Sequence, residues 1–197
     1  MKERPIIFSG PMVRAILVGA KTQTRRVVNP QPHAVRDGLY GWKQVAGGGY
    51  EVVWNALQMS GSQALSEYCP YGKPGDQLWV RETWRVNGNE HDYAAAGPDK
   101  VFYRADEDWN TDAGWRPSIF MPRWASRITL EVTGVRIQRL QDISEEDAKA
   151  EGFTGEHFDL AVNDFIWAWG TINGKREGCA WQANPWVWAV EFRAVKA

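Results

Sequence analysis

Apolar and polar residues alternate in three segments far apart in the chain, and this pattern limits the fold more than any other feature. A period of two residues is typical of strands that bury one face. The segments cover residues 73–84, where Pro74-Gly75-Asp76 forms a turn before the strand, residues 128–132, and residues 186–195. They do not alternate regularly with helices, so we expect a mixed antiparallel sheet or small β-barrel of the α+β class.

Short helices are expected at residues 11–18, 144–151 and 158–169. Pro11 suits the first helical position, and Gly19 is a natural terminator. Ser144 and Asp147 have the spacing of a capping box at the start of the second helix. Gly170 is expected to end the third helix. The motifs of dinucleotide-binding, nucleotide-hydrolysing and zinc-protease folds are absent from the sequence.

The segments 29–71 and 85–121 are rich in Gly, Asn, Asp and Pro and lack a clear period. We interpret them as two large inserts in one domain that spans residues 1–197, because 197 residues is an ordinary length for one domain.

The overall charge gives no sign of a polyanion-binding protein, because the formal net charge is −1. Cys69 and Cys179 are far apart and suggest neither a disulfide framework nor a structural zinc site. The first residues lack the apolar stretch of a signal peptide, and no apolar run approaches the roughly 18 residues of a membrane span. We therefore expect a cytoplasmic protein without a membrane partner.

The segment Gly19–Arg26 concentrates reactive and charged side chains directly after the first predicted helix. Lys21 and Thr24 form a possible amine–hydroxyl pair, since a buried lysine with a lowered pKa can accept a proton from a hydroxyl or from water. The alternative is a solvated basic strand in which Thr24 is simply a good β-former. The residues by themselves leave both interpretations open.

An ordered set of motifs resembles the ASCH domain, a PUA-like small β-barrel with flanking short helices. The pattern Gly19-x-Lys21-Thr22-x-Thr24-x-Arg26 looks like the first signature of that family. Similar matches follow in the family's order, at residues 74–80, 128–133, 143–152 and 187–192. Together they cover less than half of the chain, which also resembles longer members common in phages and prophages.

The resemblance implies an activity and a set of site residues. Small bacterial ASCH enzymes hydrolyse N4-acetylcytidine, and their catalytic Lys, Thr and Glu correspond to Lys21, Thr24 and Glu151. The implied reaction is amide hydrolysis at a modified cytosine nucleoside, with no metal and no cofactor. Lys21 is either a base or an oxyanion-stabilising cation, and Glu151 either an acid for the leaving nitrogen or the base.

Five further residues are candidates for substrate binding. Arg25 and Arg26 extend the cationic segment, and Arg25 raises its charge above that of most family enzymes. Glu82 is either solvated, paired with Arg26 or Arg81, or an acceptor for a cytosine amino group. Trp84 and Trp124 either pack in the core, as expected for most of the 12 tryptophans, or stack on a base.

Two rival functions remain beside amide hydrolysis. The chain is either a non-catalytic module for single-stranded RNA or DNA, or a phage assembly or host-interaction protein. An enzyme requires that Lys21, Thr24 and Glu151 converge at one concave pocket. A nucleic-acid module requires an open basic groove, and a scaffold requires an exposed apolar patch.

Overall fold

A five-stranded mixed sheet forms the centre of the protein, in the strand order β1-β6-β9-β10-β2. The computed structural model describes residues 1–29, 31–36, 39–41, 53–55, 69–86, 101–106 and 114–196. The five strands are β1 (Glu3–Ile7), β2 (Gln23–Val27), β6 (Gln77–Arg81), β9 (Thr129–Arg139) and β10 (Trp186–Lys196). All three alternating segments are therefore strands, as predicted.

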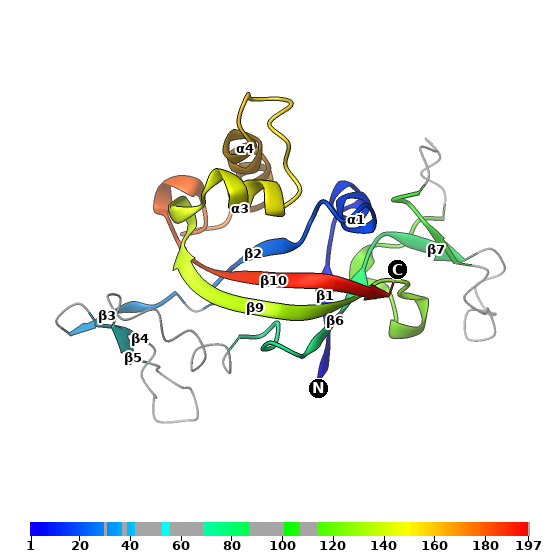
Figure 1. Cartoon of the computed structure of the whole chain (residues 1–197), viewed down its shortest axis with the longest axis horizontal. Coiled ribbons are helices and arrows are strands. Elements are labelled where there is room, and N and C mark those ends of the chain that lie inside the picture. The colour runs from blue at the N-terminus through cyan, green and yellow to red at the C-terminus, as the bar shows by residue number, and fades with distance from the viewer. Residues whose placement is uncertain are drawn as a thin grey trace.

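The sheet is antiparallel except at one edge, where β1 and β6 run parallel. β9 and β10 have 11 residues each and form two long curved strands side by side (Figure 1). β1 and β2 are the end members of the strand order, and no described strand joins them. The mixed α+β sheet is thus confirmed, but the described strands do not form a closed barrel.

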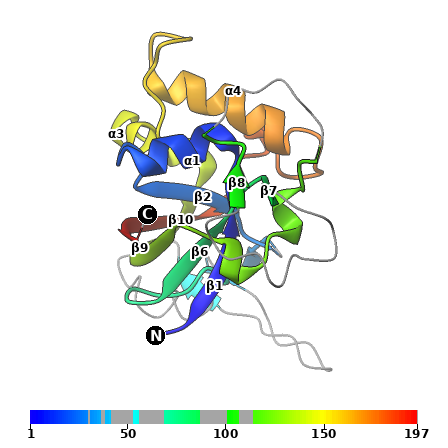
Figure 2. The ribbon, with the colours of Figure 1, turned by 90° about the vertical axis from the view of Figure 1, so that its right-hand side faces the viewer.

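Three helices lie on one side of this sheet, as both views show (Figures 1 and 2). They are α1 (Gly10–Leu17), α3 (Glu145–Ala150) and α4 (Ala161–Asn173). α1 and α3 lie within one residue of their predicted bounds at each end. Among the described residues there are also four single-turn 3-10 helices, at Ser118–Phe120, Arg123–Ala125, Leu140–Asp142 and Trp181–Ala183.

The prediction for the third helix was wrong at both ends. α4 starts late because the Glu145 carboxylate of α3 accepts hydrogen bonds from the amides of Ala161 and Val162, at 2.9 and 3.1 Å. The helix also continues through Gly170 to Asn173, because glycine within a helix costs only about 1 kcal/mol. Long-range capping therefore decides where this helix begins.

Two apolar clusters hold the helices to the sheet. The larger cluster joins α1 to β1, β6, β9 and β10 and includes Phe8, Val13, Leu130, Trp188 and Phe192. The smaller one joins α3 and α4 to the end of β10 and includes Leu140, Ala148, Phe165, Trp169 and Val187. Burial of these side chains fixes the positions of α1, α3 and α4 on the sheet.

Smaller strands occur in the segments expected to be inserts. β3 (His33–Arg36), β4 (Leu39–Gly41) and β5 (Val53–Asn55) form a three-stranded antiparallel sheet, and β7 (Trp84–Val86) pairs with β8 (Val101–Tyr103). The rest of the predicted inserts lies largely outside the described residues. Among the helices that are described, none has the length and apolar character needed to span a membrane.

Candidate functional site

Lys21 reaches its position because α1 ends abruptly. Gly19 adopts a φ of +75°, and the amides of Ala20 and Lys21 both donate to the Ala15 carbonyl, at 2.8 and 3.0 Å. This left-handed turn, which favours glycine, closes the helix and starts β2. The turn directs the Lys21 side chain toward the end of α3.

The Lys21 ammonium is fully buried and has three oxygen acceptors. Its Nζ donates to Glu151 Oε2 at 2.6 Å, to the Glu151 carbonyl at 2.8 Å and to the Gln23 carbonyl at 2.8 Å. All three ammonium protons are thus used. Burial lowers the pKa of Lys21, and the adjacent Glu151 carboxylate opposes this change.

Glu151 is the C-cap residue of α3 and is held by a second cation. Its Oε1 accepts from Arg25 at 3.3 Å, while the other end of the Arg25 guanidinium donates to Asp147 Oδ2 at 2.6 Å. Asp147 also accepts from Arg136 at 2.6 Å. Two carboxylates and three cations therefore connect β2, α3 and β9 in one charged network.

A cavity of about 660 Å³ lies beside this network. Thr24, Arg25, Arg26 and Glu151 all border it. Lys21 does not border the cavity, but its ammonium contacts Glu151, which does. Aromatic side chains supply much of the remaining lining, namely Phe8, Tyr71, Phe153, Phe165 and Trp169. The protein thus combines a desolvated charge pair with an aromatic-walled cavity.

The cavity adjoins an open main-chain edge of the sheet. Two hydrogen bonds at the ends of the β2–β10 pairing show which residues of β2 bond to β10. Val28 N donates to Trp186 O at 3.0 Å, and Phe192 N donates to Thr22 O at 2.8 Å. Antiparallel alternation then turns the main-chain N–H and C=O of Arg25 away from β10. Since no described strand pairs with the other side of β2, Arg25 presents a main-chain donor and acceptor there.

The predicted site residues divide into two groups. Lys21, Thr24, Arg25, Arg26 and Glu151 come together as described. Arg26 lies over the Phe8 ring, 5.2 Å from its centroid, and donates to the Ile7 carbonyl at 2.6 Å. The other three candidates, Glu82, Trp84 and Trp124, do not line this cavity.

Glu82 is a buried carboxylate, so the alternatives in which it is solvated or pairs with Arg26 or Arg81 were wrong. Both of its oxygens accept from Arg127, at 3.0 and 3.1 Å. Burial raises the pKa of Glu82, and Arg127 opposes that rise. Arg127 in turn binds Asp106 at 2.6 and 2.8 Å, so these three residues anchor the end of β6.

Trp84 belongs to a small apolar cluster with Met121 and Ala125. It meets Trp124 edge to face, with ring centroids 5.9 Å apart. Trp84 is 2% exposed and Trp124 42% exposed. Trp84 therefore packs in the core, which was one of its two predicted roles, while Trp124 covers it at the surface.

Sequence reasoning missed the contribution of α4 and its C-terminal turn to the cavity. The contributing side chains recur at helical spacing and comprise Phe165, Ala168, Trp169, Ile172, Asn173 and Arg176. This period was visible in the sequence, but it indicates only that one helix face is covered. Tyr71 and Phe8 complete the aromatic wall, and no local sequence pattern indicated that they line a cavity.

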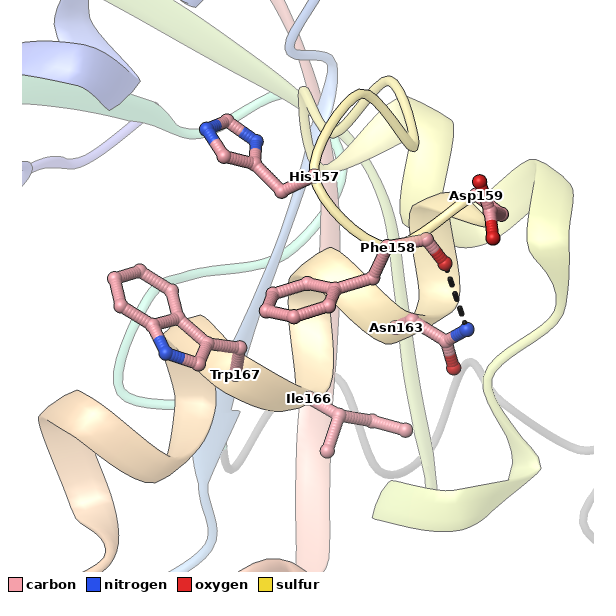
Figure 3. A pocket seen from close by; sticks show the side chains of 6 residues that line it. All are labelled: His157, Phe158, Asp159, Asn163, Ile166 and Trp167. Atoms are coloured by element: carbon pink, nitrogen blue, oxygen red, sulfur yellow. Dashed lines mark hydrogen bonds between the residues drawn. The ribbon is translucent and has the colours of Figure 1, made fainter.

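A second hollow lies on the outer side of α4 and contains none of the predicted site residues (Figure 3). Phe158, Ile166 and Trp167 provide its apolar surface, and Asn163 donates to the Phe158 carbonyl at 2.9 Å. His157 also borders it and is exposed, as expected for a surface histidine.

No group of three or more His, Cys, Asp or Glu side chains in the described segments is arranged to hold a metal ion. Cys69 and Cys179 are buried free thiols.

Comparisons with known proteins give two similar solved structures. No family model and no curated protein matches the chain. One structure is an Enterococcus faecalis protein of the DUF984 family, with TM-score 0.45 and 10% identity over 100% of this chain and 81% of that one. The other is an ASCH domain from Lactobacillus crispatus, with TM-score 0.41, 11% identity and the same coverage.

Proposed function

We propose that this protein hydrolyses the amide bond of an N4-acylated cytosine nucleoside, such as N4-acetylcytidine, or of a related modified base. The observation that carries the proposal is the buried Lys21–Glu151 pair, 2.6 Å apart, at the wall of a cavity that Thr24 also borders. Burying a charged pair is costly unless close geometry and hydrogen bonds offset the desolvation, and perturbed charged groups cluster at functional sites. Here it lies beside space for a ligand.

The hydrogen bonds favour one of the two assignments of roles. All three protons of the Lys21 ammonium are directed at oxygen atoms. Lys21 therefore stays charged and positions Glu151, and it is not the base. Glu151 Oε1 faces Arg25 at 3.3 Å, a longer contact than the one that Oε2 makes with Lys21. Glu151 borders the cavity and is therefore the general base.

The reaction balances with one water molecule and one proton carrier. Glu151 removes a proton from water as the water oxygen forms a bond to the acyl carbon. The bond between the acyl carbon and N4 then breaks, and Glu151 returns the proton to N4, which leaves as the amino group of cytosine. The acyl group departs as a carboxylic acid, which ionises at neutral pH. The Thr24 hydroxyl keeps its proton and donates a hydrogen bond to the acyl oxygen, where negative charge develops.

The surroundings suit a planar base. Phe8, Phe153 and Trp169 line the cavity with aromatic rings, and stacking of bases on such rings is tolerant of the identity of the base. The main-chain N–H and C=O of Arg25 at the open edge of β2 supply a donor and an acceptor for the polar edge of the ring. A hydrogen-bonding site of this kind rejects analogues that lack the matching group.

The test is release of acetate from N4-acetylcytidine by purified protein, followed by the change in ultraviolet absorbance as cytidine forms. Thr24→Val keeps the shape of the side chain and removes the hydroxyl, so we expect kcat to fall by about 100-fold. Glu146→Gln is the matched control, because Glu146 is an exposed carboxylate of α3 that does not line the cavity. Absence of turnover by folded wild-type protein would reject the proposal.

A non-catalytic nucleic-acid module gives a different result in the same preparation. It would leave N4-acetylcytidine intact and bind a fluorescent single-stranded oligonucleotide with an affinity that falls steeply as salt rises. The buried Lys21–Glu151 pair beside the cavity supports the enzyme over this rival.

A further inference from the structure

We infer that the cavity binds its cytosine nucleoside in a phosphorylated form, with a phosphate group held by Arg26 and Arg176. This inference rests on the proposed function, and it names the substrate class of the same site. The shared chemistry is a phosphate monoester or diester on the sugar, as in a mononucleotide or in a short strand.

The charge balance of the cavity wall is the first argument. Three lining side chains are cationic, Arg25, Arg26 and Arg176, whereas only Glu151 is anionic. Arg25 and Glu151 contact each other at 3.3 Å, and Arg25 also pairs with Asp147. Two positive charges therefore remain for a ligand, although the whole chain has a net charge of −1. A local excess of this kind favours an anion.

The hydrogen bonds of the two arginines leave donors available. Within the described segments, Arg26 bonds to the Ile7 carbonyl at 2.6 Å and Arg176 to the Asn173 side chain at 3.1 Å, and neither forms an ion pair with a carboxylate. Arg26 Nε is buried and has no partner there. Since a guanidinium has five N–H donors, both side chains retain several for phosphate oxygens.

The two arginines also act on one common group. Tyr71 borders the cavity, and burial raises the pKa of its hydroxyl while Arg26 and Arg176 both oppose that rise. Arg26, Arg176 and Tyr71 also all line the same cavity. Arg26, Arg176 and the Tyr71 hydroxyl together match the needs of a phosphate, which accepts from guanidinium and hydroxyl donors alike.

The position of Arg176 separates this anion subsite from the reacting bond. Phe165 lies at the Glu151 end, because its ring contacts Arg25 at 5.8 Å and Phe153 at 5.8 Å. Asn173 is eight residues further along α4, about 12 Å at 1.5 Å per residue, and Arg176 follows it. A base near Glu151 would therefore carry its sugar phosphate toward Arg176, not toward the amide.

The experiment compares cytidine ligands with and without phosphate groups. Calorimetry measures the affinity of wild-type protein for cytidine, cytidine 5′-monophosphate and the trinucleotide of cytidine, and turnover is measured separately on N4-acetylcytidine and its 5′-monophosphate. We expect the monophosphate to bind at least about tenfold more tightly than cytidine, the size of one charge-assisted hydrogen bond. Arg176→Gln should remove most of that ratio. Lys175→Gln, which alters a neighbouring exposed cation outside the cavity, should preserve it.

Each outcome has a defined meaning. Equal affinity for cytidine and its monophosphate, or a ratio that Arg176→Gln leaves intact, overturns the phosphate subsite. Failure to bind any of the three ligands overturns it as well. Tight phosphate-dependent binding without turnover of either acetylated substrate sustains the subsite and rejects the hydrolase. A trinucleotide that binds better than the mononucleotide identifies a strand as the source of the phosphate.

Discussion

Replacement of Glu151 by glutamine tests the buried charge pair more sharply than any other substitution. The variant keeps the shape and one acceptor oxygen of the side chain but removes the charge that faces Lys21 at 2.6 Å. Arg25 retains Asp147 at 2.6 Å, whereas no other carboxylate contacts Lys21 among the described residues. Breaking a buried pair in this way costs about 3–5 kcal/mol of unfolding free energy.

The cost should also depend on pH with a definite sign. Burial already lowers the pKa of Lys21 in the folded protein, and loss of the carboxylate lowers it further. Between that folded-state pKa and the unfolded value of about 10.4, the unfolded chain binds more protons, so stability of the variant rises with pH. The deficit of Glu151→Gln relative to wild type should therefore shrink from pH 7 toward pH 10.

Urea unfolding between pH 6 and pH 9.5 measures this deficit directly. Glu146→Gln is the control on the same helix, with an expected change below about 1 kcal/mol at every pH. A deficit for Glu151→Gln under about 1 kcal/mol at pH 7, or one that widens as pH rises, would refute the argument.

Three further predictions concern the scaffold around the site. Asp76→Asn should destabilise the protein by about 2 kcal/mol at pH 7, because backbone amides and Arg4 lower the pKa of Asp76 from 3.8 to about 2; chemical unfolding should show this difference vanish between pH 4 and pH 2, and a constant difference would contradict it. Arg127→Met should cost about 3–5 kcal/mol by leaving Glu82 buried and unpaired, while the KM for N4-acetylcytidine stays unchanged; a raised KM would place Glu82 in substrate binding. Gly152→Ala should lower the midpoint of thermal unfolding, because Gly152 has a φ of +92° and an added Cβ would lie 3.0 Å from a neighbouring side chain; an unchanged midpoint would contradict the strain.

Local patterns in the sequence were sufficient for the central strands and for two of the helices. β6 follows its turn because Pro74-Gly75-Asp76 sets the chain direction, and Gly75 indeed has a φ of +89°. The stop at Gly19 likewise needs only local backbone geometry. Such features were predictable because every group that determines them lies within a few residues.

Features that depend on distant partners were not predictable. Glu82 pairs with Arg127, 45 residues away, and nothing near Glu82 in the sequence indicates that partner. Ser144 does accept the Asp147 amide at 3.1 Å, as half of the expected capping box. The Asp147 carboxylate, however, faces Arg25 and Arg136 instead, because the charged network competes for it.

The site itself was predicted in part, and by resemblance more than by pattern. The motifs supplied Lys21, Thr24 and Glu151. Thr24 and Glu151 border one cavity, and Lys21 contacts Glu151 without bordering it. Much of the remaining lining comes from α4 and Arg176, which carried no motif. Its role became visible only when the fold placed that helix over β2.

The most direct test of the central claim is the ratio of kcat/KM for N4-acetylcytidine between wild-type protein and Glu151→Gln. The measurement is made at pH 7 and at a temperature where both are folded by circular dichroism. If Glu151 is the base at a hydrolytic centre, wild-type protein turns over the substrate and the variant loses at least about 100-fold. Equal rates for the two proteins, or no hydrolysis by wild type, would contradict the account.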